Sequence, residues 1–198
     1  MVWNALLFTI ILLALTIRLE SAGLWSPYNL ITIREVETNG ALKPASVPRG
    51  DIGTLRDPPL YVVQVNGDFY MMNGTIDLRR YTNGARAAEL NEQYMLPHKL
   101  RPAAKDVLVV GSGGGVDVEA ALLSGAEHVD ALEIDPVIIQ LGRQFNPSQS
   151  YQDPRITVVN TDARPFFRRT NKTYDMIVFG FLDSQSLFSW IKRWMWPG

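Results

Sequence analysis

The sequence contains no cysteine, and this absence excludes a disulfide framework, a thiolate metal site and a cysteine nucleophile. Its two histidines, His98 and His128, lie far apart without metal-ligand spacing, so we expect no bound metal. It also lacks an excess of charge of either sign. The formal net charge of −1 gives no reason to expect a nucleic acid partner or attraction to an anionic membrane surface. The 198 residues suit one full domain with attachments.

One long hydrophobic run stands at the N-terminus. Residues 2–17 are apolar except for Asn4, Thr9 and Thr16. As a helix this run would be about 24 Å long, close to the hydrocarbon core of about 30 Å. A signal peptide requires positively charged residues before its apolar run, and no charged residue precedes this one. A helix packed in a soluble protein has a polar face, and this run has none. We therefore expect a transmembrane helix over residues 1–20, with a signal peptide as the main alternative.

Residues 21–100 are predicted to form a small β-hairpin subdomain and a linking helix. The run Asn66-Gly67-Asp68 is typical of a hairpin turn, because Asn and Gly tolerate the positive φ values that such a turn needs. Strands are expected at residues 29–35, 60–65 and 69–72. A helix is predicted over residues 85–94, and we expect it to stop before Pro97.

From residue 101 to residue 189 apolar strands alternate with helices. Strands are predicted at residues 107–110, 129–134, 156–160 and 176–179, and helices at residues 116–124, 136–145 and 164–169. This alternation indicates a Rossmann-like, three-layer α/β domain with a parallel sheet covered by helices on both faces. Only four strands precede a tryptophan-rich tail at residues 190–198, so we expect the sheet to be incomplete at the C-terminus. A truncated chain or a frame change near Phe188 would explain the tail, with a membrane-surface anchor as the alternative.

The first of these strands leads into a glycine-rich turn, Gly111-Ser112-Gly113-Gly114-Gly115, and then into a helix. Such a turn lets the backbone approach a ligand, while the first N–H groups of the helix face the ligand. The third glycine of a dinucleotide fingerprint is replaced by Val116, so NAD is the minor interpretation. The turn instead suits a ligand with an uncharged or zwitterionic tail.

Acidic residues follow the next two strands. Glu133 comes about 20 residues after the turn, where a carboxylate accepts hydrogen bonds from the hydroxyls of a ribose. Asp162 follows the third strand and could accept a hydrogen bond from an adenine amino group, cap the helix that begins there, or do both. The residues predicted to bind the cofactor are Gly111, Ser112, Gly113, Gly115, Asp117, Glu133, Ile134, Asp162 and Ala163.

These motifs carry a family resemblance. Residues 106–179 resemble the cofactor domain of spermidine synthases within the class I methyltransferase fold, through the glycine turn, Glu133-Ile134-Asp135, Asp162-Ala163 and Tyr174-Asp175-Met176-Ile177. Residues 94–100 are similar to spermidine synthase-like proteins that are fused to membrane helices. The resemblance implies S-adenosylmethionine or its decarboxylated form as cofactor, and transfer of an aminopropyl or methyl group to a small-molecule acceptor such as a polyamine. It also implies a membrane-associated protein whose cofactor domain faces the cytoplasm, and it leaves a homo-oligomer open.

The sequence departs from the family pattern at two positions. Aminopropyltransferases carry an acidic residue directly after the fourth strand, where Gly180 stands here, and only the second acid of that run is matched, by Asp183 as the catalytic candidate. They also place an aspartate in the glycine turn, where Gly114 stands here. A residue without a side chain cannot accept a proton from the attacking amine. Two alternatives therefore stay open: a methyltransferase, in which positioning carries most of the rate, and a non-catalytic nucleotide-binding or membrane scaffold module.

Overall fold

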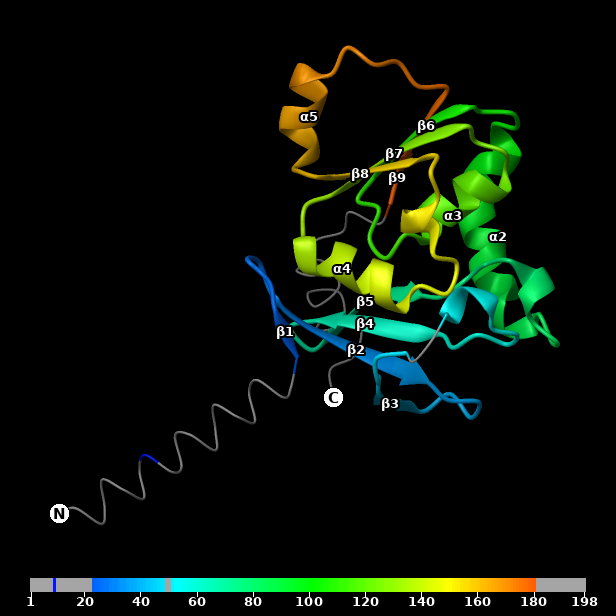
Figure 1. Cartoon of the computed structure of the whole chain (residues 1–198), viewed down its shortest axis with the longest axis vertical. Coiled ribbons are helices and arrows are strands. Elements are labelled where there is room, and N and C mark those ends of the chain that lie inside the picture. The colour runs from blue at the N-terminus through cyan, green and yellow to red at the C-terminus, as the bar shows by residue number, and fades with distance from the viewer. Residues whose placement is uncertain (1–8, 10–22, 49–50, 181–198) are drawn as a thin grey trace, which may run out of the picture.

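The computed structural model describes Thr9, residues 23–48 and residues 51–180 (Figure 1). Apart from Thr9, the predicted transmembrane helix over residues 1–20 lies outside these ranges, as do the tail at residues 190–198 and Asp183. Within the described ranges, no helix combines the length and apolar character that crossing a membrane requires.

An antiparallel sheet forms the N-terminal part of the described chain. Its strands are β1 (Leu24–Trp25), β2 (Leu30–Val36), β3 (Leu42–Pro44), β4 (Tyr61–Val65) and β5 (Asp68–Asn73). The order is β1-β2-β4-β5, with β3 also paired to β2. The predicted hairpin between β4 and β5 is confirmed, because Asn66 and Gly67 adopt φ values of 54° and 90°. Short 3-10 turns lie at η1 (Ile52–Thr54) and η2 (Leu78–Arg80).

A parallel sheet forms the second part and confirms the predicted alternation. It contains β6 (Asp106–Val110), β7 (His128–Glu133), β8 (Ile156–Asn160) and β9 (Met176–Phe179). The order is β8-β7-β6-β9, and each neighbouring pair is parallel. The chain thus runs outward from β6 to β8 and then crosses back to the other side of β6. In open α/β sheets, such a reversal leaves a crevice at the carboxyl ends of the strands, where ligands bind.

Helices cover both faces of the parallel sheet, as predicted. One face, with Val107 and Val109, packs against α3 (Val116–Leu123) and α4 (Pro136–Phe145), and η3 (Ser150–Gln152) adds Tyr151 to that core. The opposite face packs Leu108, Val110 and Leu132 against Phe166 of α5 (Ala163–Arg169). Figure 1 shows α5 on the side of the sheet away from α3. Two hydrophobic layers therefore hold the strands whose ends carry the candidate site.

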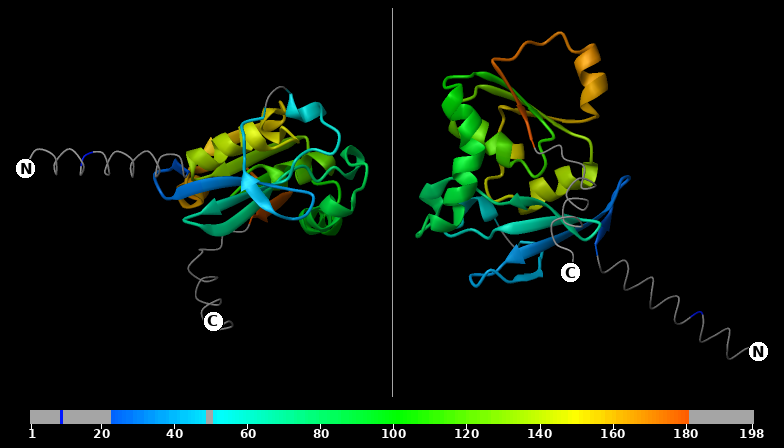
Figure 2. Two further views of the ribbon diagram at one scale, coloured as in Figure 1. Left: turned by 90° about the horizontal axis from the view of Figure 1, so that it is seen from below. Right: turned by 180° about the vertical axis from the view of Figure 1, so that it is seen from behind.

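Helix α4 also joins the two sheets. Ile139 packs into the core of the parallel sheet. Ile138, Leu141 and Phe145 pack against the antiparallel sheet, where the rings of Phe145 and Tyr61 meet edge to face at 5.3 Å between centroids. Figures 1 and 2 show the antiparallel sheet at one end of the molecule, with α4 lying between it and the parallel sheet. The antiparallel sheet thus brings β5 next to the glycine turn.

The predicted end of the linking helix is wrong. Helix α2 (Ala85–Leu100) continues through Pro97 to Leu100, one turn beyond the expected stop. Proline lacks an N–H and disfavours the helical conformation of the preceding residue, but both effects are local. The helix is held by packing, because Leu90, Tyr94 and Met95 contact a buried cluster of Ile76, Val116 and Ala120. Tertiary contacts with α3 therefore outweigh the local cost of Pro97.

Candidate functional site

The glycine turn connects the end of β6 to the start of α3. Gly111, Gly113 and Gly115 adopt φ values of 70°, 55° and 90°, a region that side chains disfavour. Gly115 is also the residue at which α3 begins. These three glycines are therefore required by the backbone path itself.

Side chains from other elements hold this turn in place. The N–H of Gly113 donates to Oε2 of Glu133 at 2.9 Å. Its carbonyl accepts from the hydroxyl of Tyr151 at 2.7 Å. Nδ2 of Asn146 donates to the carbonyl of Gly114 at 2.7 Å, and Oγ of Ser150 donates to the carbonyl of Gly115 at 2.8 Å. The turn is thus pre-organised before any ligand arrives. Sequence reasoning missed Asn146, Ser150 and Tyr151, because no local pattern marks them.

Ser112 contributes to this support rather than to a ligand contact through its side chain. Its Oγ lies 2.7 Å from the hydroxyl of Tyr151. Because the single proton of that hydroxyl goes to Gly113, Ser112 donates and Tyr151 accepts. Its backbone is engaged as well, because its N–H donates to the carbonyl of Leu132 at 2.8 Å and its carbonyl accepts from the N–H of Gly115 at 2.9 Å.

A cavity of about 560 Å³ lies across the carboxyl ends of the parallel strands. Its volume is in the range of small-molecule sites. It brings together five predicted site residues, namely Gly111, Glu133, Ile134, Asp162 and Ala163, with Tyr70, Val110, Leu132, Thr161, Arg164, Phe167 and Phe179. We call this space the large cavity.

Glu133 is buried at the wall of the large cavity, with 3% of its surface exposed. Besides the bond from Gly113, its Oε1 accepts from the N–H of Asp135 at 2.9 Å. Burial raises the pKa of Glu133, and these backbone hydrogen bonds partly oppose the rise. Each carboxylate oxygen keeps a second lone pair, so Glu133 can still accept the two hydroxyls of a ribose.

Asp162 lies at the tip of β8 and caps α5. Its Oδ1 accepts from the N–H of Arg164 at 2.9 Å, and its Oδ2 pairs with Nη2 of Arg164 at 2.7 Å. The hydrogen bonds from Arg164 lower the pKa of Asp162. The capping interpretation is therefore confirmed, and the contact with an adenine amino group stays a prediction. Both are compatible, because Asp162 lines the large cavity.

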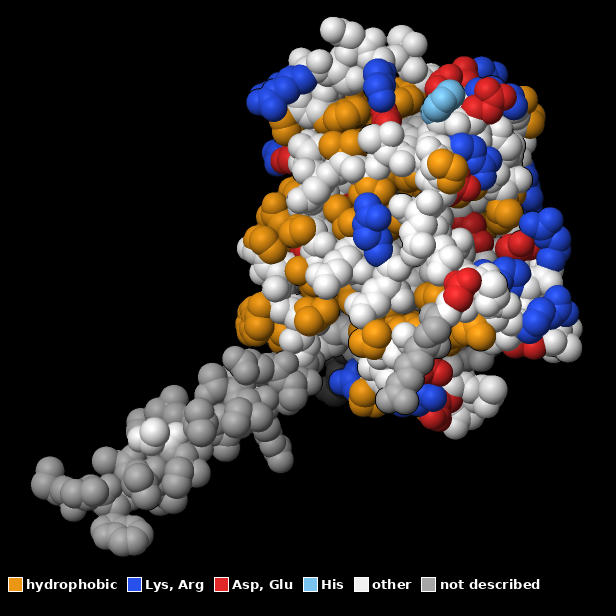
Figure 3. Space-filling view, in the orientation of Figure 1, with side chains coloured by type: hydrophobic (Ala, Val, Ile, Leu, Met, Phe, Trp, Pro, Cys, Tyr) orange, Lys and Arg blue, Asp and Glu red, His pale blue; other side chains and the backbone are white. Residues whose placement is uncertain are grey.

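Exposed apolar side chains line the same cavity. The rings of Phe167 and Phe179 are stacked with an interplanar angle of 26° and centroids 6.3 Å apart, and both are exposed. Ile134 is also exposed and lines this space. Figure 3 shows hydrophobic side chains reaching the surface between α5 and α4. Flat apolar walls of this kind suit a planar base. The sequence offered only one signal for Phe179, its place at the end of a strand.

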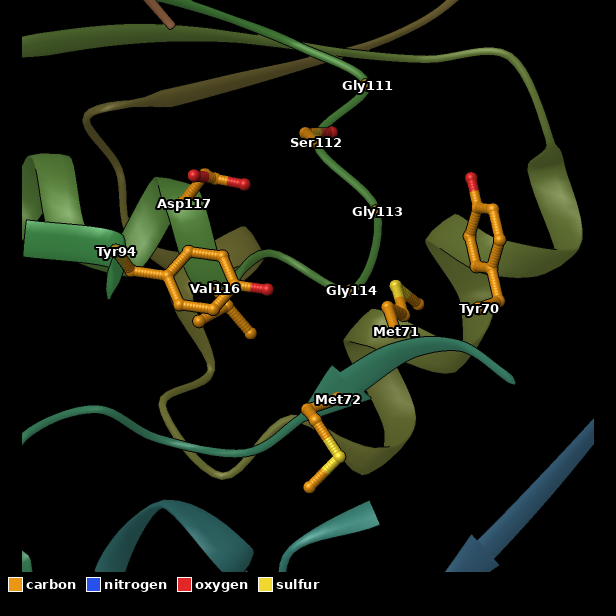
Figure 4. Close-up of a pocket in the computed structure, with 10 residues that line it drawn as sticks. All are labelled: Tyr70, Met71, Met72, Tyr94, Gly111, Ser112, Gly113, Gly114, Val116 and Asp117. Atoms are coloured by element: carbon orange, nitrogen blue, oxygen red, sulfur yellow. The ribbon is translucent and has the colours of Figure 1, made fainter. Parts of the chain in front are cut away.

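A second, narrow cavity of about 40 Å³ lies beside the turn. Its lining residues are Tyr70, Met71, Met72, Tyr94, Gly111, Ser112, Gly113, Gly114, Val116 and Asp117 (Figure 4). Tyr70 and Gly111 line both cavities, so the two spaces adjoin at the start of the turn. Asp117, predicted as a cofactor contact, lies here and not with Glu133. Burial raises the pKa of Asp117 to about 6.

The two glycines that depart from the family pattern lack room for a side chain. A Cβ at Gly114 would lie 2.8 Å from Oδ1 of Asn73, the last residue of β5. Asn73 is fully buried, and neither atom of its amide has a hydrogen-bond partner among the described residues. A Cβ at Gly180 would overlap the carbonyl oxygen of Gly111. The backbone carbonyl of Gly111 therefore excludes a side chain at residue 180, and the buried amide of Asn73 opposes one at residue 114.

These features define a class of protein. A parallel sheet with its reversal at β6, a glycine turn before a helix and a buried carboxylate at the tip of β7 are together typical of a nucleotide-type cofactor site in an α/β domain. No group of three or more His, Asp or Glu side chains suited to a metal ion occurs within the described ranges.

Comparisons with known proteins show which proteins this chain resembles. The family model "Spermine/spermidine synthase domain" matches residues 93–190. Polyamine aminopropyltransferase 1 of Streptomyces coelicolor is 32% identical over 124 residues, which cover 57% of this chain and 23% of that protein. Polyamine aminopropyltransferase of Pectobacterium carotovorum is 35% identical over 94 residues, which cover 43% and 33% respectively. Residues 93–190 thus resemble a spermine/spermidine synthase domain, and the chain is similar to polyamine aminopropyltransferases.

A solved structure supports the fold. The probable spermidine synthase of Corynebacterium glutamicum matches with a TM-score of 0.50 and 14% identity, over 81% of this chain and 52% of that one. The chain spans about a quarter of the length of the Streptomyces relative and about half of this structure.

Proposed function

We propose that this chain carries the cofactor site of an aminopropyltransferase-like enzyme that uses decarboxylated S-adenosylmethionine. The observation that carries the proposal is the position of Glu133, which is hydrogen-bonded to the glycine turn and lines the large cavity at the carboxyl edge of the parallel sheet. The names of the curated relatives support aminopropyl transfer, with a polyamine as the acceptor class.

Different residues that line the two cavities would bind different parts of such a cofactor. Glu133 would accept hydrogen bonds from the ribose hydroxyls, and Asp162 from the adenine amino group. Ile134, Phe167 and Phe179 would flank the base in the large cavity. The backbone of the glycine turn would lie against the sulfonium tail, close to the narrow cavity. When bound, the cofactor supplies a carbon that its positive sulfur activates toward a nucleophile.

Methyl transfer from S-adenosylmethionine is the second candidate, and Gly180 favours it. Residue 180 has no side chain and no space for one, so it cannot accept a proton from an attacking amine. A methyl acceptor that is already nucleophilic would need positioning more than a base. The same large cavity would hold the adenosyl part of either cofactor.

Membrane attachment through residues 1–20, with the cofactor domain on the cytoplasmic side, is a proposal supported by the apolar run in the sequence. Homo-oligomerisation also stays a proposal. Fractionation of cells that produce the full chain, followed by alkaline extraction, tests the attachment. Retention in the pellet supports it, and release into the supernatant contradicts it.

Calorimetric titration of the full chain tests the cofactor site. We expect saturable binding of decarboxylated S-adenosylmethionine or S-adenosylmethionine, no binding of NAD, and loss of binding in Glu133→Ala. The tighter of the two sulfonium ligands selects aminopropyl or methyl transfer. A folded chain that binds neither would contradict the transferase proposal and leave a non-catalytic module.

A further inference from the structure

Strand β9 runs beside β6 up to the start of the glycine turn. The N–H of Gly180 donates to the carbonyl of Val110 at 2.8 Å, one residue before Gly111. A side chain at residue 180 would collide with the carbonyl of Gly111, and its Cβ would lie 3.4 Å from Oδ2 of Asp117. The carboxylate of Asp117 therefore lies next to the position that the Cβ of a side chain at residue 180 would occupy.

Asp117 reaches this place from the first turn of α3. Gly115, in the left-handed conformation, is the residue at which α3 begins, and Asp117 lines the narrow cavity beside the turn. Figure 4 shows Asp117 on the same side of the turn as Tyr94. Its carboxylate makes no hydrogen bond or ion pair with another residue of the described ranges. A helix N-terminus stabilises a negative charge, but here burial has the larger effect and raises the pKa to about 6.

The other carboxylates that line the two cavities are already engaged. Glu133 accepts backbone hydrogen bonds on both oxygens, and Asp162 is paired with Arg164. The titratable groups facing Asp117 are Tyr94 from α2 and Tyr151 from η3, and burial raises the pKa of each well above the neutral range. Neither phenol is ionised at neutral pH, so neither competes as a base. Among the described lining groups, this leaves Asp117 free to take up a proton.

We propose that Asp117 is the general base of the transfer reaction and performs the task that an acid at residue 180 would otherwise perform. This inference rests on the proposed aminopropyl transfer. The lone pair of the acceptor amine forms a C–N bond to the sulfonium carbon, while the C–S bond breaks and its electron pair goes to sulfur. Sulfur leaves as a neutral thioether, and the excess proton on nitrogen passes to a carboxylate oxygen of Asp117. Atoms and charge balance with no further reactant.

Asp117→Asn in the full chain tests the role, with decarboxylated S-adenosylmethionine and putrescine as substrates. We expect kcat to fall by about 100- to 1,000-fold, the usual contribution of a general base. The Kd of the cofactor should stay within about threefold, because Asn keeps the shape. Asp117→Glu should keep part of the rate, since it restores the carboxylate. Asp106→Asn, which changes an exposed carboxylate at the opposite end of β6, is the control and should leave kcat unchanged.

The pH profile separates a base from a structural residue. In the parent, kcat should fall about tenfold per pH unit below pH 6, and this limb should be absent in Asp117→Asn. A kcat in Asp117→Asn within twofold of the parent, with the limb intact, overturns the role of Asp117 alone. A parent chain that binds the cofactor but yields no aminopropylated product overturns the proposed function and the role of Asp117 with it.

Discussion

The two cavities on either side of the glycine turn differ in how their polar side chains are held. In the large cavity, Glu133 and Asp162 are fixed by backbone hydrogen bonds and by an arginine. Beside the narrow cavity, Asp117 lacks a hydrogen-bonding partner among the described residues, and so does the buried amide of Asn73. Fixed groups suit recognition of a rigid adenosyl part, and unengaged groups suit proton transfer or contact with a variable tail. This difference in side-chain contacts supports cofactor binding in the large cavity and proton transfer beside the narrow cavity.

The largest effect should come from removing the carboxylate of Glu133 from the large cavity. Glu133→Ala removes both the contact to a ribose and the hydrogen bond that positions Gly113. We expect a loss of cofactor affinity of at least about 100-fold, the size of two charge-assisted hydrogen bonds. Calorimetry measures it. Glu133→Gln keeps the shape of the side chain and is the control, for which a smaller loss is expected. An unchanged affinity in Glu133→Ala would show that the ligand binds elsewhere.

The packing at Gly114 tests whether Asn73 occupies the space of a side chain in the turn. Gly114→Asp should destabilise the chain by about 1–3 kcal/mol, the cost of overpacking. Asn73→Ala in the same chain should recover most of that loss, because it empties the space that the new side chain needs. Chemical denaturation measures both variants. If the double variant is no more stable than Gly114→Asp alone, the two positions do not share that space.

Beside the narrow cavity, Asp117 should lower the stability of the fold while it supports activity. Its pKa in the folded chain, about 6, exceeds the ordinary value of 3.8. The unfolded chain therefore loses this proton at lower pH, so the charged form destabilises the fold progressively from about pH 4 to pH 6 and by a constant amount above. Asp117→Asn should raise the free energy of unfolding by up to about 3 kcal/mol at pH 7.5 and by very little at pH 3.5. Urea titrations at both pH values measure this. Equal effects at the two values would contradict the raised pKa.

The smallest effect should come from the cap of α5. Asp162→Ala removes the hydrogen bond to the N–H of Arg164 and should lower the free energy of unfolding by about 1 kcal/mol. Asp162→Asn can still cap the helix and should cost less. If Asp162 also contacts the adenine, Asp162→Ala will weaken cofactor binding by about tenfold. A change in stability without any change in affinity would leave Asp162 as a cap only.

Much of the fold could be predicted because its signals are local. The helix over residues 136–145 has the predicted bounds, since Pro136 starts it and Asp135 caps it. The hairpin at Asn66-Gly67 and the positive φ values of the glycine turn follow from residue type. The continuation of α2 through Pro97 could not be predicted, because packing against α3 decides it.

In the candidate site, too, some residues could be predicted from local sequence signals, whereas others depend on contacts between distant elements. Glu133 and Asp162 could be placed from the ends of predicted strands, because parallel strands bring their carboxyl ends to one edge. The residues that hold the turn, such as Asn146 and Tyr151, come from the segment after α4 and carry no local signal. The environment of Asp117 depends on Tyr94 in α2 and on Gly180 in the last described position of the chain. Contacts of this kind arise only when distant elements fold together.

A crystal structure of the full chain with decarboxylated S-adenosylmethionine tests the central claim most directly. We predict that the ribose hydroxyls lie within hydrogen-bond distance of Glu133, that the base lies beside Phe179, and that the sulfonium tail enters the narrow cavity next to Asp117. A ligand bound outside the large cavity, or one whose tail points away from Asp117, would contradict the division between a binding side and a reactive side of the turn.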